Sequence, residues 1–201
     1  MNDVELRYRK NKELVLKKLS FKTNGGEKIG IVGRTGAGKS TLALTLTRIV
    51  EKEAGNIKID GVDISEINLR QVRENITIIP QEPVLYKGTL KYNLDPTERI
   101  PESEILDLLK RAGLDEIILK KQTEKKESLE ELKIELTEEE KKEMETENNS
   151  LLNFSIGDGG DGLSSGEKAL VCICRAILRK NKIVILDEAT ANIDIETEQK
   201  I

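Results

Sequence analysis

Hydrophobic positions near the N-terminus recur at every second residue, which is the period of a β-strand. Val4, Leu6 and Tyr8 alternate with polar residues, and parts of 14–21 do the same. This alternation predicts two antiparallel strands. They lead into the apolar stretch 28–32, which predicts a buried strand directly before a glycine-rich turn.

Further along the chain, short apolar runs alternate with segments of helical period, which predicts an α/β fold. Strands are expected over 55–61, 76–79 and 183–186, the last of them buried, and helices over 42–50, 69–74, 101–113 and from 163–167 to 178.

The stretch 120–147 departs from both patterns, because it is a dense tract of lysine and glutamate. Ser128 with Glu131, and Thr137 with Glu140, have the spacing of a capping box, so short exposed helices are one interpretation. Disorder is the other. In either case a solvent-exposed segment outside the core is favoured over a specific binding site.

Composition limits the classes of function. Charged residues make up 35% of 201 residues, but the formal net charge is only −4, so a broad basic face for nucleic acid is not expected. One main domain with a smaller lobe fits this length. The N-terminus lacks the pattern of a signal peptide, and the longest apolar run, 169–174, is far shorter than a membrane span. Cys172 and Cys174 are interpreted as small buried hydrophobic residues, which favours the cytosol.

The segment 33–41 carries the most specific chemistry, because Gly33, Gly38, Lys39 and Ser40 match G-x-x-x-x-G-K-[ST]. Such a loop directs backbone N–H groups at phosphate oxygens, with the lysine reaching the β- and γ-phosphates and the serine hydroxyl binding Mg²⁺. A glycine-rich turn with a surface lysine is the plainer interpretation. The apolar strand predicted before the loop and the helix after it favour nucleotide binding.

Two further groups of polar residues follow predicted strands. Asp187 and Glu188 follow 183–186, where an aspartate could bind Mg²⁺ and a glutamate could polarise an attacking water. Gln81 lies in a proline-flanked loop after 76–79 and could reach a metal or a water, or could be an ordinary loop glutamine.

Ser164 or Ser165 is a plausible N-cap of the last predicted helix, and Glu167 falls in its first turn, where a negative charge suits the helix dipole. A capped helix explains these residues. A serine and a glycine at a helix start, here Ser164 and Gly166, would also serve a second phosphate contact. Tyr8 could fill the sheet surface or stack on a nucleobase.

The order of these motifs resembles that of ATP-binding cassette (ABC) proteins. The amino-acid sequence of 25–36, 93–96 and 189–194 is similar to that of the C-terminal cassette of the multidrug-resistance-associated C subfamily, whose members are membrane exporters. The resemblance implies a P-loop NTPase core, with a mixed sheet that has antiparallel N-terminal strands. It also implies an inserted helical subdomain over about 90–180, with a charged insertion over about 120–150. By the same resemblance, 1–201 is a nucleotide-binding domain that is incomplete at its C-terminus, after the D-loop.

The resemblance also implies residue roles, with ATP and Mg²⁺ as cofactors. Tyr8 would stack on adenine, Asp187 would be the Walker B aspartate and Glu188 the catalytic glutamate. Gln81 would touch the metal and the water beside the contact to the membrane domain. Ser164 and Gly166 would cover the ATP of a second cassette, and Asp194 would communicate across that dimer. The phosphate contacts would come from the Walker A residues Gly33, Arg34, Thr35, Gly36, Ala37, Gly38, Lys39, Ser40 and Thr41. The expected partners are a second cassette and transmembrane domains, at the cytoplasmic face of a membrane, with the cassette soluble in itself.

Two departures from the family pattern bear on activity. Glu167 stands where the family usually has glutamine, which places a carboxylate near a partner's phosphates, and Lys168 could offset it. The family's switch histidine has no counterpart, since the chain contains no histidine. A non-hydrolysing regulatory ATP-binding protein is therefore an alternative to an exporter ATPase, and so is a soluble cassette ATPase without a transporter.

Overall fold

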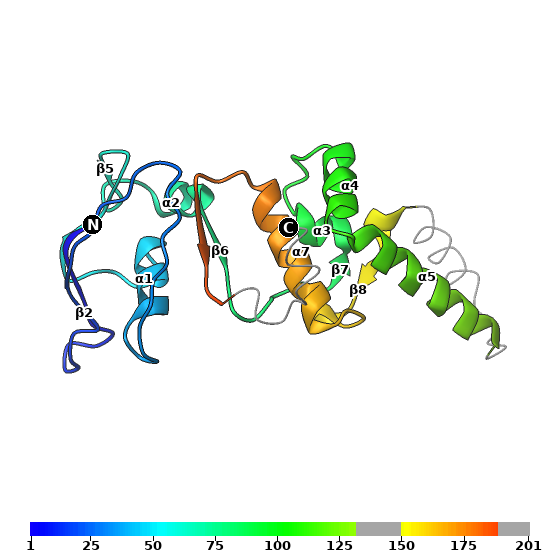
Figure 1. The fold of residues 1–201 in the computed structure, drawn as a ribbon, viewed down its shortest axis with the longest axis horizontal. Helices are drawn as coiled ribbons and strands as arrows, with labels where there is room; N and C mark the ends of the chain where they lie inside the picture. The colour runs from blue at the N-terminus through cyan, green and yellow to red at the C-terminus, as the bar shows by residue number, and fades with distance from the viewer. Residues whose placement is uncertain (132–149, 189–201) are drawn as a thin grey trace. The chain divides into compact units, whose positions relative to one another are not determined.

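The computed structural model describes residues 1–131 and 150–188, and Figure 1 draws its fold. The chain divides into two compact units. Unit 1 comprises 1–78 and 181–185, and unit 2 comprises 79–180 and the residues from 186 onward. Each unit has a hydrophobic core of its own, so each is described by itself.

An antiparallel sheet in the order β2-β1-β3 opens unit 1, formed by β1 (Asn2–Leu6), β2 (Leu16–Leu19) and β3 (Ala54–Asn56). Val4 pairs with Leu19 and Leu6 with Leu16, and both β1 side chains are fully buried. The two antiparallel strands predicted from the alternating pattern are confirmed. Alternate residues of a strand point to opposite faces, so the apolar row of β1 enters the core.

The remaining elements of unit 1 are short. Helices α1 (Lys39–Leu46) and α2 (Leu69–Asn75) accompany a hairpin of β4 (Lys58–Ile59) and β5 (Val62–Asp63). Asp60 and Gly61 join these two strands with φ of 49° and 85°, as a type I′ turn requires. The core of the unit is formed by buried Val4, Leu6, Leu16, Ile57, Ile64, Val72 and Ile76.

Helix α1 is shorter than the apolar pattern over 42–50 predicts. Arg48 has a φ of 51°, which is outside the helical region and ends the element. Its guanidinium donates to the carbonyls of Ile64 and Ile67, both at 2.9 Å. Tertiary hydrogen bonds therefore hold this side chain at the end of the helix, which apolar periodicity does not reveal.

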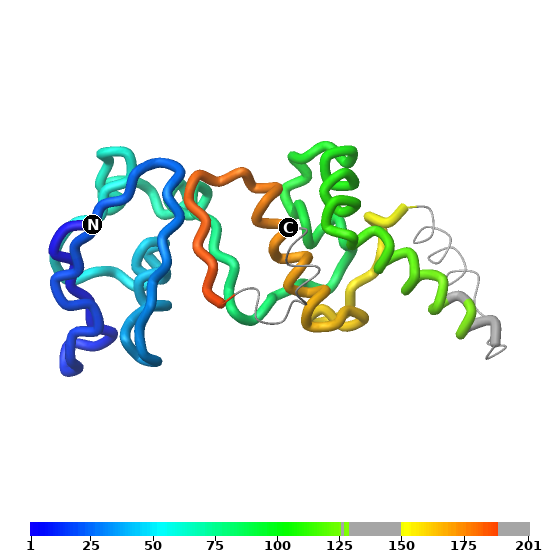
Figure 2. The backbone as a smooth tube through the Cα atoms, in the orientation of Figure 1, coloured from blue at the N-terminus to red at the C-terminus, as the bar shows by residue number. Residues whose placement is uncertain are grey.

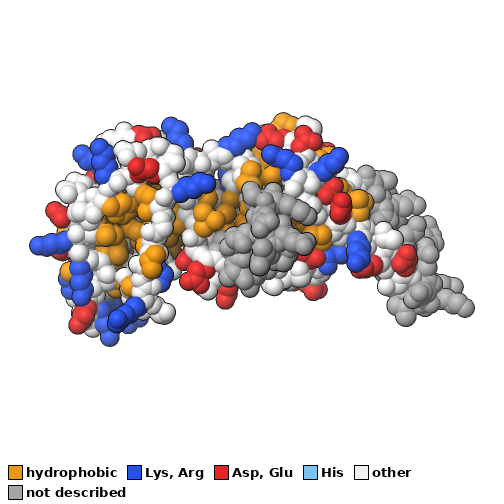
Figure 3. Space-filling model, viewed as in Figure 1, with side chains coloured by type: hydrophobic (Ala, Val, Ile, Leu, Met, Phe, Trp, Pro, Cys, Tyr) orange, Lys and Arg blue, Asp and Glu red, His pale blue; other side chains and the backbone are white. Residues whose placement is uncertain are grey.

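The strand predicted over 28–32 is not formed. Ile29 and Ile31 are 52% and 53% exposed, and Val32 is 98% exposed. Hydrophobic side chains lie open on the face of unit 1 seen in Figure 3. A strand exists only through pairing, and among the described strands none pairs with this stretch. The apolar side chains of 28–32 do have a high strand propensity, but propensity does not determine whether a second strand is present to pair with.

Strands β6 (Ile76–Ile79) and β9 (Ile183–Leu186) form a two-stranded sheet, as the apolar runs predicted. The expectation that β9 is buried is wrong, since Val184 and Leu186 are exposed. Among the described strands β9 pairs only with β6, so one row of its side chains faces solvent.

Helix α7 (Ser165–Leu178) is the central element of unit 2. Figure 2 shows it beside segments that are distant in the sequence, α3 (Leu90–Leu94) and α4 (Glu102–Arg111), and both pack against it. Helix α5 (Leu114–Glu131) packs against α4. Strands β7 (Gly88–Thr89) and β8 (Ser155–Ile156) pair antiparallel, and two 3₁₀ turns cover Leu151–Asn153 and Asp158–Gly160.

The start of the lysine and glutamate tract belongs to one long helix. Gly113, with a φ of 69°, separates α4 from α5, and Leu114 and Ile118 fix α5 to the core because both are fully buried. Ser128 lies inside this helix, so the capping box proposed there is wrong. The second proposed capping box, at Thr137, and the predicted D-loop residue Asp194 lie outside the described residues.

Candidate nucleotide-binding site

The phosphate loop of unit 1 makes its turn with two glycines in the left-handed region, Gly36 at φ 80° and Gly38 at φ 96°. A Cβ on Gly38 would also come within 3.2 Å of the Val15 side chain. Helix α1 begins at the next residue. Gly38 is its N-cap without any capping side chain, and the first turn contains no acidic residue. The positive end of the helix is therefore left for an external anion.

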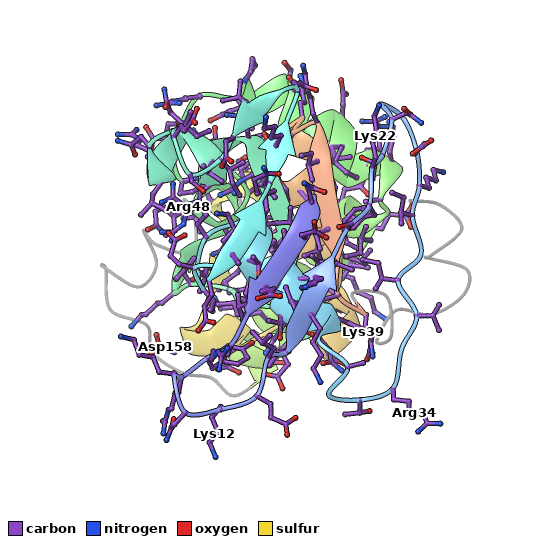
Figure 4. The ribbon with its side chains drawn as sticks, turned by 90° about the vertical axis from the view of Figure 1, so that its left-hand side faces the viewer. Lys12, Lys22, Arg34, Lys39, Arg48 and Asp158 are labelled. Atoms are coloured by element: carbon purple, nitrogen blue, oxygen red, sulfur yellow. The ribbon has the colours of Figure 1, made fainter. Side chains whose placement is uncertain are left out.

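Lys39 turns back over this loop. Its Nζ donates to the carbonyl of Gly33 at 2.8 Å and, more weakly, to that of Arg34 at 3.4 Å. Figure 4 shows the Arg34 side chain pointing outward from the loop. The loop carbonyls thus hold the ammonium over the turn, where a phosphate oxygen would be a stronger, charged acceptor. The donor set fits a polyphosphate.

The two residues after Lys39 differ in exposure. Ser40 is exposed, so its hydroxyl can reach a ligand, whereas Thr41 is buried. The Thr41 hydroxyl lies 2.9 Å from the phenolic oxygen of Tyr8. The Tyr8 side chain remains 53% exposed. Its hydroxyl is fixed to the phosphate-loop helix while its ring stays open to solvent, which suits a stacking surface.

In unit 2 the predicted catalytic residues lie together. The Gln81 amide Nε2 donates to the Glu188 carboxylate Oε2 at 3.0 Å. The backbone N–H of Asp187 donates to the carbonyl of Ile79 at 3.0 Å, which brings the Gln81 loop to the end of β9. Glu188 has a φ of 53°, a conformation that costs a non-glycine residue about 1 kcal/mol or more. Strain of this kind is often found at functional sites.

The predicted capped helix of unit 2 is confirmed, with Ser164 as the N-cap of α7. The Ser164 Oγ accepts from the Glu167 N–H at 3.3 Å, and the Glu167 carboxylate accepts from the Ser164 N–H at 2.7 Å. This is a reciprocal capping box. Ser164 is exposed and Gly166 half-buried, so both stay accessible at the surface.

The charge that offsets Glu167 does not come from Lys168, as the sequence suggested. The Lys168 Nζ donates to the carbonyl of Gly159 at 2.9 Å. Lys121 of α5 forms the ion pair instead, with its Nζ 3.2 Å from the Glu167 carboxylate. Only the folded chain brings these residues from two helices together.

Sequence reasoning also missed the polar residues that fix the loop after Gln81. The Arg175 Nε donates to the Asn93 carbonyl at 2.6 Å, and its Nη1 donates to the Val84 carbonyl at 3.2 Å. The Asn93 amide exchanges hydrogen bonds with the backbone of Tyr86, both at 2.8 Å. The available signal was an arginine within the apolar part of this helix, because a partly buried charge needs partners.

Asp95 is a structural acid of unit 2. Burial on its own would raise the pKa of this carboxyl, but hydrogen bonds from the Ile100 N–H and from the Thr97 hydroxyl and N–H outweigh it and lower the pKa. The carboxylate accepts from the Ile100 N–H at 2.7 Å and from the Thr97 hydroxyl at 2.8 Å. Asp95 is therefore ionised and closes the turn between α3 and α4.

The described residues contain no group of three or more His, Cys, Asp or Glu side chains that could hold a metal by themselves. Mg²⁺ is commonly bound by only one or two carboxylates together with substrate phosphates, so the Asp187 carboxylate of unit 2 suits this ion. Within 1–131 and 150–188, no helix has the length and apolar character needed to cross a membrane.

Comparison with known proteins agrees with this chemistry. A family model described as ABC transporter matches residues 16–191. The chain is 45% identical to the "ATP-dependent bile acid permease" of Saccharomyces cerevisiae, over 100% of this chain and 12% of that protein. It is 42% identical to "ATP-binding cassette sub-family C member 3" of Rattus norvegicus, over 98% of this chain and 11% of that protein.

A solved structure, "Structure of a bacterial Atm1-family ABC exporter with ATP bound", superposes with a TM-score of 0.78 at 29% identity, over 100% of this chain and 30% of that chain. The fold and the phosphate loop define a P-loop NTPase. The chain belongs to the ABC transporter family, as a nucleotide-binding domain that resembles the C subfamily. It spans 12% or less of the length of the two relatives named above.

Proposed function

We propose that this chain is an ATP-binding and ATP-hydrolysing cassette that powers transmembrane export as part of an ABC transporter. The observation that carries the proposal is the pairing of Gln81 with Glu188 at 3.0 Å, in a chain whose phosphate loop holds the Lys39 ammonium over its turn. Family membership alone supports nucleotide binding. The paired amide and carboxylate add a group that can orient a water and take its proton.

Binding rests on the residues of unit 1. The backbone N–H groups of 33–41 receive the phosphates, and Lys39 exchanges its loop carbonyls for β- and γ-phosphate oxygens. The exposed Tyr8 ring receives the adenine, with its hydroxyl fixed by Thr41. The Ser40 hydroxyl, Gln81 and Asp187 would hold Mg²⁺, which would supply positive charge against the phosphates.

Hydrolysis rests on Glu188. Its carboxylate accepts a proton from the attacking water, and the Gln81 amide fixes the orientation of that carboxylate through the hydrogen bond to Oε2. The left-handed backbone at Glu188 sets the direction of the side chain at the end of β9. Lys39 stabilises the negative charge that develops on the transferred phosphoryl group.

Two surfaces are proposed for the partners. Ser164 and Gly166, both accessible at the start of α7, cover the ATP of a second cassette. The transmembrane domains contact the loop after Gln81, where Val84 and Tyr86 are exposed together with Tyr92 of α3. Arg175 and Asn93 brace this loop against α7, so movement of one reaches the other. From this proposed contact we infer a position at the cytoplasmic face of a membrane.

A second candidate is a regulatory ATP-binding protein that does not hydrolyse its nucleotide. The observation that favours it is Glu167, whose carboxylate occupies the N-terminus of α7 and accepts from the Ser164 N–H. The charge of such a carboxylate, taken without its ion pair, opposes the approach of a partner's phosphates. Stable ATP occupancy of the purified protein without phosphate release would support this candidate over the first.

The substitution Glu188→Gln tests hydrolysis directly. We expect ATP affinity to be kept and turnover to fall by about 10²–10⁴-fold, because the variant lacks the proton acceptor. ATP binding is followed by titration and turnover by phosphate release. Glu82→Gln, which removes an exposed carboxylate next to Gln81, is the matched control and should leave turnover unchanged. Equal turnover in the two variants would remove Glu188 from its proposed role.

A further inference from the structure

The carboxylate of Glu167 interacts with two groups of unit 2. It accepts from the Ser164 N–H at 2.7 Å, and it is 3.2 Å from the Lys121 ammonium. The side chains of Glu167 and Lys121 are only 17% and 28% exposed, so solvent screens their interaction less than that of a surface pair. The negative charge of Glu167 is compensated locally.

The lysine that compensates the charge of Glu167 is Lys121 of α5, and neither of two nearby lysines takes its place. Lys168 follows Glu167 in the sequence, but its ammonium is engaged by the Gly159 carbonyl, and its aliphatic part lies against Gly160. Lys120, adjacent to Lys121, is directed at Glu124 with 3.8 Å between the charged atoms and is largely exposed. Lys121 is therefore the lysine of α5 that forms an ion pair with Glu167 at the start of α7.

Without Lys121, a carboxylate without an ion-pair partner would lie beside Ser164 and Gly166, the residues proposed to cover a partner's triphosphate. Like charges at such a distance repel, and the repulsion grows when closure excludes water. With Lys121 in place, Glu167 can keep its capping role at the helix N-terminus while its charge is neutralised. The same carboxylate then stabilises α7 without opposing the nucleotide.

We propose that Lys121 is a positioning residue for nucleotide capture between cassettes: it neutralises Glu167, so that the start of α7 can receive the triphosphate held by a second cassette. This inference rests on the proposed function of Ser164 and Gly166. It gives α5 a role in the ATP-driven closure of the two cassettes. The sequence had suggested only a solvent-exposed segment outside the core for this region.

The test uses the complete natural polypeptide that contains this chain, with a radiolabelled non-hydrolysable ATP analogue. The readout is the analogue concentration that gives half-maximal occlusion, measured as nucleotide retained after rapid filtration. For Lys121→Ala we expect this concentration to rise about tenfold. Lys120→Ala, on the same helix, is the matched control and should behave as the wild type. Open-state binding to the phosphate loop, measured at low temperature, should be unchanged in both.

Glu167→Gln separates a charge role from a structural one. It removes the ion pair as Lys121→Ala does, so a purely structural pair predicts the same defect in both variants. A charge role predicts normal occlusion for Glu167→Gln, restoration in the double variant Lys121→Ala with Glu167→Gln, and rescue by Lys121→Arg. Equal occlusion by Lys121→Ala and Lys120→Ala, or a defect in Glu167→Gln, would overturn the role of Lys121 but not the proposed function. If the wild-type protein binds the analogue but occludes none, both the proposed function and the role of Lys121 are overturned.

Discussion

Two helix N-termini carry the residues proposed to meet nucleotide, and they are built in opposite ways. Helix α1 begins after Gly38, which offers no capping side chain, and its first turn has no acidic residue. Helix α7 begins after Ser164 with a complete capping box, and Glu167 supplies a negative charge in its first turn. The first leaves its positive end open, whereas the second satisfies two of its N–H groups with its own side chains.

This difference separates the tasks of the two ends. An open helix end binds an anion through its N–H groups, at a cost to the stability of the helix without ligand. A self-capped end is stable by itself, because the capping box already satisfies the N–H groups of Ser164 and Glu167. A ligand should therefore stabilise α1 more than α7, because the start of α1 has no side-chain cap.

The largest expected effect concerns the open end. Lys39→Ala should weaken ATP binding by about 10- to 150-fold, because it removes a charge-assisted hydrogen bond to phosphate worth about 1.5–3 kcal/mol. ATP-dependent association with a second cassette should be lost as a consequence. Titration with ATP measures the first effect. Lys28→Ala, at an exposed lysine ahead of the loop, is the control, and equal affinity in both variants would contradict the loop assignment.

The closed end gives the next effect. Ser164→Ala should lower the free energy of unfolding by about 1 kcal/mol through loss of the N-cap, with little change in binding to the phosphate loop. Ser165→Ala changes an exposed neighbour that is not the N-cap and should cost far less. Urea unfolding compares the two variants. If both unfold at the same denaturant concentration, the capping box does not stabilise α7 as described.

The smallest expected effect is a pH dependence of the free energy of unfolding that comes from a thiol in α7. Helix α1 has no counterpart, since it contains no cysteine. Burial raises the pKa of Cys174 to about 12. The unfolded thiol titrates near pH 8.5, so this contribution to stability is complete below that pH and is lost progressively as pH rises from there toward the folded value. Between pH 7 and about pH 9 we expect a loss of about 0.5–1 kcal/mol. Urea unfolding at both pH values measures it, and Cys174→Ala should remove this part of the pH dependence. A slope unchanged by the substitution would show that Cys174 does not contribute.

Local signals in the sequence were sufficient for many elements. Alternation of Val4 and Leu6 predicted β1, and Ser164 with Glu167 predicted the start of α7. Each depends on interactions within a few residues or on the side-chain period of one element. Such interactions act before the chain has found its distant partners.

Predictions failed where pairing with a remote segment decides the outcome. The stretch 28–32 has the composition of a strand, yet among the described residues it has no partner, and its side chains are exposed. Likewise, β9 was expected to be buried but has a single neighbour among the strands that the structure describes. β-Propensity describes how well a residue fits a pleated surface and does not specify which strand provides that surface.

The sequence by itself determined the phosphate loop, its glycines and lysine, the acidic pair after β9 and the capped start of α7, because each is a pattern of adjacent residues with its own geometry. Only the tertiary structure decided that Gln81 binds Glu188, that Lys121 and not Lys168 compensates Glu167, and that Asn93 and Arg175 brace the loop between them. These contacts join residues tens of positions apart. Their partners are selected by the packing of whole helices and strands, which no short window of sequence contains.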